Sequence, residues 1–354
     1  MISINGRYRL HNISGIPRYA TNIVKEFDKK HQARFKVISP NGSLVRRGLS
    51  SILWENIFLP LAAKNDVLWN PSGSGPIFCE NTVTTIHDVS FMAYPEWFSR
   101  EYCLYYRFLT ERLVKSSIEV ITISEFSKSE IIKYFPAAES KIKVIYNGAS
   151  DGIMGNIGDV SDEKLRIVMQ KYQLNGPYFF CLGTLEPRKN INRIIRGWQK
   201  ANIYNECALV VGGAVDKGSV FSQINISGQG HLNIKFIGSV EECDLGALYS
   251  GSVAFIYGSL YEGFGLPPIE ALASGTDVVV SDIPCLKEIL CDLPLYYFDP
   301  YSENDIAEGV IYAYNHYHSN DEQRKVKNAR LIMEKYSWAN AAEEIWKILE
   351  KYDA

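Results

Sequence analysis

Residues 253–275 read VAFIYGSLYEGFGLPPIEALASG, and they divide into three parts. The first part is apolar, as in a β-strand, and Gly263 and Gly265 follow it in a turn where the backbone can approach a ligand closely. Pro267 and Pro268 suit the first positions of a helix, where a missing backbone N–H does least harm. A strand, a glycine turn and a helix in this order predict one βα unit.

The same alternation runs along the whole chain. In the first half the β-rich runs are ISIN, FKVIS, DVLWN, TVTTIHD, EVITIS and SKIKVIYNG, with amphipathic stretches at 18–29 and 98–115. In the second half they are PYFFCLG, ALVVGG, IKFIGS, VAFIYGS, DVVVS and LYYFD. Alternating strands and helices are typical of parallel sheets. We therefore predict an α/β protein with two Rossmann-like, doubly wound parallel sheets.

Length and composition set the domain organisation. A chain of 354 residues suits two domains, and the polar stretch 149–162 is the most linker-like segment. We predict one domain over residues 1–160 and a second over 161–337. Ligands of open parallel sheets bind at the carboxyl ends of the strands, so we expect the two domains to face each other across a cleft.

Charge and cysteine content narrow the class of protein. The net charge of -3 argues against a nucleic-acid partner, but residues 1–150 carry 19 Lys+Arg against 13 Asp+Glu, so this half can face an anionic surface. The seven cysteines form no C-x-x-C pair and are expected to be buried thiols of a reduced compartment. No signal peptide and no run of about 18 apolar residues is visible, which predicts a cytoplasmic protein.

Charged residues follow two strands of the second half. Arg188 and Lys189 lie between PYFFCLG and a helical pattern, where two cations beside a helix amino terminus suit a diphosphate. A solvated basic turn is the alternative. Glu262 precedes the glycine turn, and Glu270 is expected in the first turn of the following helix, where it would either serve a ligand or merely cap the helix.

The first half offers fewer candidates. Gly15 lies in a loop between a strand and a helix, which is equally typical of an ordinary turn. His87 and Asp88 follow TVTTI, at the end of a strand where cleft residues lie, although Asp88 can simply cap the next segment. His316 and His318 point to different sides of a helix, and no Asp-x-Asp motif occurs, so no metal site is predicted.

Taken together these residues resemble the retaining glycosyltransferases of the GT-B kind, glycosyltransferase family 4, which includes bacterial mannosyltransferases and sucrose synthases. The resemblance covers nearly the whole chain. Its motifs, in chain order, are SGIPRY at 14–19, the His87-Asp88 pair, SEFSKSEI at 124–131, VIYNG at 144–148, PRKN at 187–190 and EGFGLPPIE at 262–270. The last motif matches the family's E-x7-E signature. The final helix, about 338–354, resembles the one that crosses back to the first domain.

The resemblance implies a role for each site residue. In a donor nucleotide sugar, Glu270 would bind the ribose, Arg188 and Lys189 the diphosphate, and Glu262 the sugar hydroxyls. His87 would bind the donor sugar, and Gly15 would let its loop approach the phosphates. Backbone N–H groups of the glycine turn would bind phosphate and sugar oxygens; they belong to Gly263, Phe264, Gly265 and Leu266. Arg18 and Asp88 would lie on the acceptor side. Glu262, His87, Arg188 and Lys189 would be the catalytic group. Protein cations would then neutralise the leaving group without a metal or other cofactor.

The resemblance also implies an activity. It is the transfer of a hexose, with retention, from a nucleotide sugar to a hydroxyl of a growing surface polysaccharide such as O-antigen or capsule. GDP-mannose is the favoured donor, with UDP-sugars as the other choice. The acceptor would be lipid-linked, which suggests peripheral attachment to the inner face of an anionic cell membrane. Alternatives are a nucleotide-sugar epimerase or a phosphorylase on the same fold, and a two-lobed sugar-binding protein without catalysis.

Overall fold

The computed structural model describes residues 1–10, 15–41, 49–149, 161–183, 186–213, 232–319 and 322–353. Its contacts divide the chain into two units. Unit 1 consists of residues 1–148 and 336–354, and unit 2 of residues 149–335. The boundary predicted after residue 160 falls at the end of the stretch 150–160, which lies outside the described residues.

Unit 1 is built on a six-stranded parallel sheet. Its strands are β1 Ile2–Asn5, β2 Phe35–Ile38, β3 Val67–Asn70, β4 Thr82–Thr85, β5 Glu119–Thr122 and β6 Ile142–Val144. They lie in the order β2-β1-β3-β4-β5-β6, so the order reverses between β1 and β3. All described strand pairs are parallel, with Ile4 opposite Trp69.

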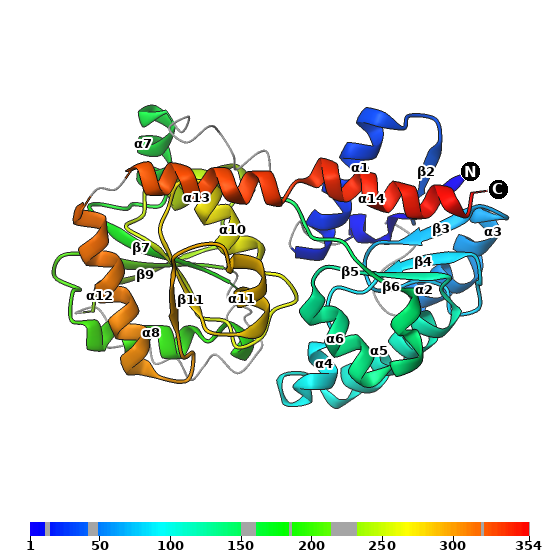
Figure 1. Ribbon diagram of the computed structural model, residues 1–354, viewed down its shortest axis with the longest axis horizontal. Coiled ribbons are helices and arrows are strands. Elements are labelled where there is room, and N and C mark those ends of the chain that lie inside the picture. The colour runs from blue at the N-terminus through cyan, green and yellow to red at the C-terminus, as the bar shows by residue number, and fades with distance from the viewer. Residues whose placement is uncertain are drawn as a thin grey trace. The chain divides into compact units, whose positions relative to one another are not determined.

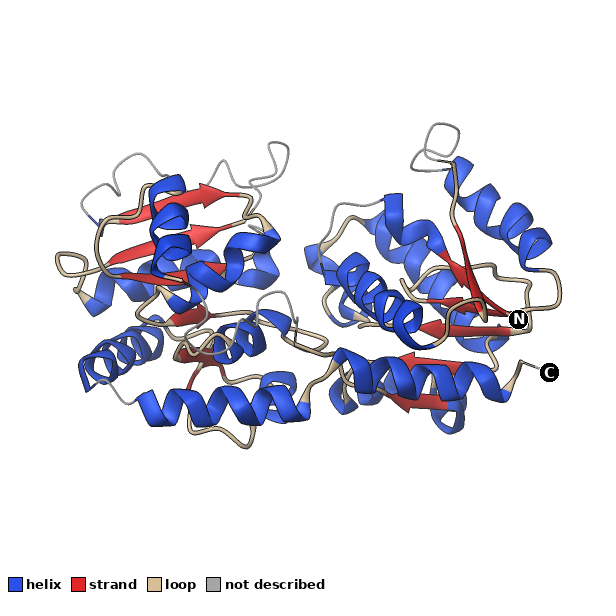
Figure 2. Ribbon diagram, turned by 90° about the horizontal axis from the view of Figure 1, so that it is seen from above, coloured by secondary structure: helices blue, strands red, loops and turns tan. Residues whose placement is uncertain are grey.

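Helices cover the strands of unit 1, as the blue ribbons around the red strands show (Figure 2). The longer ones are α1 Gly15–Lys30, α5 Arg100–Ser116, α6 Glu125–Tyr134 and α14 Trp338–Lys351. The shorter ones are η1 Gly6–Leu10, α2 Leu49–Leu53, η2 Trp54–Phe58, α3 Leu59–Ala63, α4 Ser90–Ala93, η3 Pro95–Trp97 and η4 Pro136–Lys141.

The final helix of the chain belongs to unit 1, where α14 packs on α1 (Figure 1). Trp346 stacks on His31 with ring centroids 3.8 Å apart and meets Phe27 edge-on. A Cβ atom on Gly148 would lie 2.1 Å from the backbone nitrogen of Trp338, so only glycine allows this close approach. The return of the last helix is thereby fixed by packing at both of its ends.

Unit 2 holds the second parallel sheet. Its strands are β7 Tyr178–Leu182, β8 Ala208–Gly212, β9 Ile234–Gly238, β10 Phe255–Tyr257, β11 Val278–Ser281 and β12 Tyr296–Phe298. The order β12-β11-β10-β7-β8-β9 reverses between β7 and β10, which is the arrangement of a dinucleotide-binding Rossmann sheet. Every strand that the sequence predicted is therefore present, in both units.

The helices of unit 2 lie on both faces of its sheet. They are α7 Asp162–Lys171, η5 Pro187–Lys189, α8 Ile191–Ala201, α9 Glu242–Ser250, α10 Leu266–Ala273, α11 Pro284–Leu290, α12 Glu303–Ser319 and α13 Glu322–Lys335. Helices α8 and α12 pack on each other, and α10 packs against α9 and α13. Buried Trp198 and Phe179, with ring centroids 5.4 Å apart, join α8 to the sheet.

The expectation that the cysteines are buried thiols is only partly right. All seven are free, as expected, but only Cys181, Cys207 and Cys285 are buried. Cys243 and Cys291 are exposed, and the other two are half-buried. The prediction was wrong for these residues because apolar neighbours in the sequence do not determine whether a side chain near the end of a helix faces the core or the solvent.

None of the helices in the described ranges combines the length and the apolar composition that a membrane span requires.

Candidate functional site

Three of the proposed donor residues, Arg188, Lys189 and Glu262, gather where the strand order of unit 2 reverses. Arg188 and Lys189 lie in the 3-10 turn η5 after β7, and Glu262 lies in the loop after β10, the neighbouring strand. The backbone nitrogen of Leu260 donates to the carbonyl of Arg188 at 2.8 Å, which joins the two loops directly. Ligands of doubly wound sheets bind at this point of the carboxyl edge.

Glu262 is the centre of the cluster. Its Oε1 accepts from Lys189 Nζ at 2.6 Å and its Oε2 from Arg188 Nη1 at 3.1 Å, while only 9% of its side chain is exposed. Burial on its own would raise the pKa of Glu262, but the charges of Lys189 and Arg188 outweigh it and lower the pKa to about 2. The site therefore holds an ionised carboxylate gripped by two cations.

The two cations are not a solvated surface pair. The side chain of Lys189 is 13% exposed and that of Arg188 is 21% exposed, which excludes this alternative. Lys189 also donates to Tyr257 Oη at 3.1 Å, and its ammonium lies 5.3 Å from the centre of the Tyr257 ring. Burial lowers the pKa of Lys189, and the Glu262 carboxylate offsets part of this effect. Both cations are fixed in place before any ligand arrives.

The glycine turn brings backbone close to this cluster. Gly265 has φ 103°, and a Cβ atom there would lie 2.6 Å from Leu286 Cδ2, so the position requires glycine on both counts. The Phe264 ring is buried, and its carbonyl accepts from Cys285 Sγ at 3.3 Å. Residues 263–265 are buried and Leu266 is half-buried, and the ligand contacts predicted for this turn stay a prediction.

Glu270 lies in the second turn of α10, and the prediction that it lies in the first turn is wrong. The helix begins at Leu266 and has no acidic residue in its first turn, so Glu270 does not cap it. The side chain is 1% exposed, and Oε2 accepts from Tyr249 Oη at 3.4 Å. The capping alternative is therefore excluded, and the ligand-binding role of Glu270 stays a prediction.

In unit 1, His87 and Asp88 have different surroundings. The buried His87 ring meets Tyr19 edge-on, and its Nε2 lies 2.8 Å from the Pro71 carbonyl. Burial lowers the pKa of His87, and Nε2 is the donor in this contact because a carbonyl oxygen can only accept. Asp88 Oδ1 accepts from the backbone nitrogen of Ser90 at 2.9 Å, but α4 begins at Ser90 with Val89 as its N-cap residue and no side-chain capping bond, so this contact forms a turn before the helix and is not a helix cap.

Gly15 and Arg18 lie on the first turn of α1. Gly15 is exposed, and a Cβ atom there would meet no atom within 4 Å, so packing among the described residues does not demand glycine. Arg18 is half-buried. The adjoining residues 11–14, which include Ser14 of the SGIPRY motif, lie outside the described residues.

Sequence reasoning missed a buried polar network in unit 1. Asn5 and Asn70 end the neighbouring strands β1 and β3, and Asn5 Nδ2 donates to Asn70 Oδ1 at 3.1 Å. The same group donates to Glu55 Oε1 at 3.1 Å, and Glu55 Oε2 accepts from Arg7 Nη1 at 2.6 Å. An asparagine closing each of two apolar runs was the available signal.

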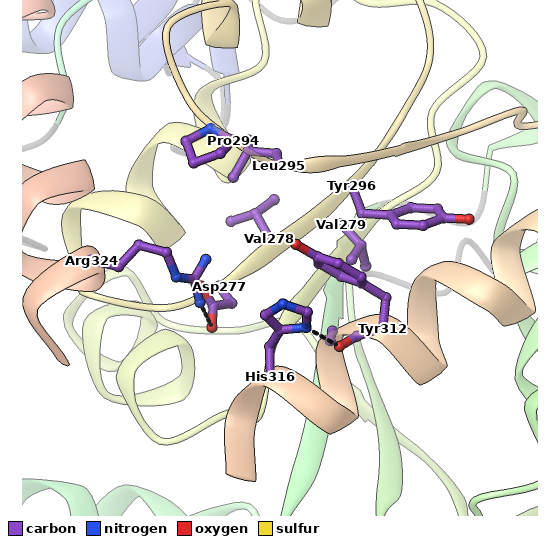
Figure 3. A pocket seen from close by; sticks show the side chains of 10 residues that line it. Asp277, Val278, Val279, Pro294, Leu295, Tyr296, Tyr312, His316 and Arg324 are labelled. Atoms are coloured by element: carbon purple, nitrogen blue, oxygen red, sulfur yellow. Dashed lines mark hydrogen bonds and ion pairs between the residues drawn. The ribbon is translucent and has the colours of Figure 1, made fainter. Parts of the chain in front are cut away.

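A pocket of unit 2 lies at the opposite edge of its sheet (Figure 3). It is lined by residues that precede or begin β11 and β12 and by residues of α12 and α13. Arg324 pairs with Asp277 at 2.9 Å, and His316 Nδ1 lies 2.8 Å from the Tyr312 carbonyl (Figure 3). These contacts lie at the amino ends of the strands, whereas the Glu262 cluster follows the carboxyl ends. This pocket is therefore separate from the Glu262 cluster.

Solved structures share the fold over the whole chain. The chain matches WaaG, a glycosyltransferase involved in lipopolysaccharide biosynthesis, with a TM-score of 0.73 and 14% identity over 99% of each chain. It matches Anabaena HepE, solved in complex with UDP and glucose, with a TM-score of 0.70 and 18% identity over 99% of each chain. At this identity the likeness shows the fold alone, and it confirms the predicted GT-B fold class.

Sequence relatives show the family. The chain is 30% identical to O-antigen chain mannosyltransferase B of Escherichia coli over 283 residues, 78% of this chain and 72% of that protein. It is 34% identical to O-antigen chain mannosyltransferase RfbU of Salmonella typhimurium over 219 residues, 61% of this chain and 56% of that protein. Residues 166–332 match the family model described as Glycosyl transferases group 1. The chain therefore belongs to the group 1 family of glycosyltransferases.

Proposed function

We propose that this glycosyltransferase moves a hexose, with retention, from a nucleotide sugar to a hydroxyl of a growing, lipid-linked surface polysaccharide. The observation that carries the proposal is the cluster of Glu262, Lys189 and Arg188 at the reversal of strand order in unit 2. Fixed cations at that point suit a diphosphate. The names of the O-antigen mannosyltransferase relatives support GDP-mannose as the donor, with UDP-sugars as the other choice.

In this proposal the donor lies along the carboxyl edge of unit 2. Lys189 and Arg188 bind the diphosphate, Glu262 holds hydroxyls of the sugar, and Glu270 holds the ribose. Backbone N–H groups from Gly263 to Leu266 meet phosphate and sugar oxygens. His87 and Gly15 of unit 1 serve the donor sugar and the phosphates, and Arg18 and Asp88 serve the acceptor. The chemical reason is that buried, preorganised charges stabilise a leaving phosphate without reorganising during the reaction.

The reaction needs no separate protein base in this scheme. The acceptor hydroxyl attacks the anomeric carbon from the side that the diphosphate leaves. The bond from that carbon to the phosphate oxygen breaks, a bond to the acceptor oxygen forms, and the hydroxyl proton passes to the leaving phosphate. Configuration is retained because both oxygens occupy the same face.

A panel of nucleotide sugars tests the proposal. GDP-mannose is expected to raise the melting temperature of the protein and to be hydrolysed slowly in the absence of acceptor, because a ligand that binds only the folded state stabilises it. A UDP-sugar that does so instead would assign the other donor. A protein that responds to none of the nucleotide sugars would refute the proposed activity.

Glu270→Ala is expected to weaken nucleotide-sugar binding by roughly 1–3 kcal/mol, the range for losing hydrogen bonds to a charged group. Turnover at saturating donor should change little, because the ribose does not react. Calorimetric titration and saturation kinetics measure the two effects separately. Glu288→Ala, in the neighbouring helix α11, is the control. Unchanged affinity in Glu270→Ala would remove this residue from the site.

Activity is expected to survive excess EDTA. Lys189 and Arg188 supply two positive charges against the single charge of Glu262 where the diphosphate would lie, so protein cations rather than a divalent metal are expected to stabilise it. The rate of transfer is measured before and after chelation. Complete loss of activity, restored by added magnesium or manganese, would show that a metal takes this role.

The protein is also expected to bind vesicles of anionic lipid through unit 1. The helical segment from α2 to α3 exposes 54% of Leu53, 61% of Phe58 and 69% of Leu61. The neighbouring loop exposes 83% of Phe78, and its Ile77 nitrogen donates to Asn56 Oδ1 at 3.1 Å. Exposed apolar side chains in one helical segment and its neighbouring loop, in a half of the chain with an excess of basic residues, suit an anionic membrane surface.

Co-sedimentation with vesicles checks this expectation. The double variant Phe58→Ser, Leu61→Ser should lose most of the binding, and added salt should weaken it. The control is Ile167→Ser on α7 of unit 2, where 55% of the side chain is exposed. Binding that ignores both the charge of the lipid and the salt would contradict the role of an anionic membrane.

A further inference from the structure

The buried network of unit 1 lies where a doubly wound sheet binds ligands. The strand order of this sheet reverses between β1 and β3. Asn5 and Asn70 are the last residues of these two strands, and Arg7 follows Asn5 in the next turn. In unit 2 the same topological position holds the Glu262 cluster. A ligand at the carboxyl edge of unit 1 would therefore meet the group around Arg7.

The network is centred on one carboxylate. Glu55 is 2% exposed, and its Oε1 accepts from Asn5 Nδ2 at 3.1 Å and from Ser74 Oγ at 2.8 Å. Its Oε2 accepts from Arg7 Nη1 at 2.6 Å. The backbone nitrogen of Arg7 donates to Asn5 Oδ1 at 3.1 Å, so the residue is held at both its backbone and its side chain.

The surrounding backbone makes room for this arrangement. Glu55 lies in a π-helical turn, Trp54–Phe58, between α2 and α3. Such turns are uncommon and are frequent at functional sites. A Cβ atom on Gly75 would lie 2.5 Å from Asn70 Cγ, so glycine at this position leaves space for the asparagine side chain. Burying an ion pair costs desolvation free energy that apolar packing would avoid, so structure alone does not account for it.

Arg7 keeps capacity for a ligand. Its side chain is 16% exposed, and among the residues that the structure describes no acceptor reaches its Nε, although that atom is buried. A guanidinium has five N–H groups, and Glu55 receives one of them in the contact at 2.6 Å. Because the Glu55 carboxylate offsets the charge of Arg7, the pair attracts a phosphate less than a lone guanidinium would, and its remaining donors suit the hydroxyl oxygens of a neutral sugar.

We propose that Arg7 binds a hydroxyl of the acceptor saccharide and that Glu55 is the positioning residue that orients its guanidinium. This rests on the proposed function, which requires a second substrate with hydroxyl groups. Arg7 then contributes to acceptor affinity and specificity, and Glu55 acts only through Arg7. The donor residues of unit 2 are not involved in this subsite.

Saccharide binding by the full chain tests the proposal without any nucleotide sugar. The probes are the methyl α-glycosides of mannose, glucose, galactose and rhamnose, followed by saturation-transfer NMR. At least one is expected to bind the wild type, and Arg7→Lys should weaken it about tenfold, as for a lost hydrogen bond to a charged group. Arg9→Lys, on the same turn but exposed, is the matched control and should bind as the wild type does.

Kinetics with an accepted sugar separate a positioning role from a structural one. Arg7→Lys and Glu55→Gln should raise KM for the acceptor about tenfold, while KM for the donor, slow donor hydrolysis and melting temperature stay near the wild type. If Glu55→Gln does not fold, Arg7→Lys decides alone. The proposal is overturned if no glycoside binds, or if Arg7→Lys binds the glycoside as the wild type does. It is also overturned if inorganic phosphate displaces the glycoside, or if acceptor binding is lost only in proportion to a fall in melting temperature. Because saccharide binding is measured without a nucleotide sugar, failure of this proposal is distinguished from failure of the proposed activity, which the panel of nucleotide sugars tests.

Discussion

Lys189→Ala is expected to lower turnover at saturating donor by about 10²–10³-fold, the range for losing one preorganised group that stabilises developing charge. The leaving diphosphate gains negative charge as its bond to the sugar breaks. In the proposed function Lys189 stabilises this charge, and it is held in place by Glu262 at 2.6 Å and by Tyr257 at 3.1 Å, in a site where little water can replace it. Its loss should therefore affect the chemical step more than donor affinity.

The matched control for this variant is Lys200→Ala. Lys200 lies near the end of α8, the helix that follows η5, and pairs with Glu303 at the surface. That variant should keep wild-type turnover, since exposed ion pairs contribute little. Rates are measured at saturating donor together with melting temperatures. Normal turnover in Lys189→Ala would show that Arg188 alone stabilises the leaving group. A loss of turnover that is explained by unfolding would contradict a role of Lys189 in the chemical step.

The strands of this fold were predictable because of how parallel sheets are buried. Strands covered on both faces read as short, continuous apolar runs, and ALVVGG and DVVVS are such runs. The helix starts were less certain. Pro267 and Pro268 marked the beginning of α10, but the helix includes Leu266 before them, and this shift moves Glu270 from the first turn into the second. Helix ends commonly shift by one or two residues.

The Glu262 cluster was also predictable from the sequence, whereas the buried polar network of unit 1 was not. Arg188 and Lys189 lie in the connection after β7 and Glu262 in the loop after β10, so the rule that ligands bind at the carboxyl ends of parallel strands identified them. Glu55 lies in a π-helical turn and is 48 residues from Arg7 in the chain. No local pattern identifies a partner at that separation, so only the asparagines that end β1 and β3 pointed to this edge.

Glu262→Gln is expected to separate turnover from nucleotide affinity. The substitution keeps the size of the side chain and removes its charge. In the free site the Glu262 carboxylate pairs with Lys189 at 2.6 Å and with Arg188 at 3.1 Å, so a diphosphate must compete with it for both cations. Without that competition, GDP or UDP should bind at least as tightly as in the wild type.

Turnover should nevertheless fall by roughly 10- to 100-fold at saturating donor, equivalent to losing a hydrogen bond to a charged group in the transition state. In the proposed site Glu262 holds the hydroxyls of the sugar as positive charge develops at the anomeric carbon, and a neutral amide stabilises that charge less. A lower kcat with an unchanged KM indicates an interaction that is made only in the transition state, and a KM that also falls indicates that the ground-state competition for the cations was removed. Calorimetry with the nucleoside diphosphate measures the nucleotide affinity, and kinetics at saturating donor measure the turnover.

Glu186→Gln is the control, because Glu186 also contacts Arg188, at 3.4 Å, but is 51% exposed. If charge near Arg188 were all that mattered, both variants would shift nucleotide affinity in the same direction and neither would lose turnover. Weaker nucleotide binding with normal turnover in Glu262→Gln would make this carboxylate an anchor for the donor. Normal turnover with a large fall in melting temperature would make the cluster structural. Only a fall in turnover without a loss of affinity agrees with two cations and one carboxylate that are arranged for the departing diphosphate.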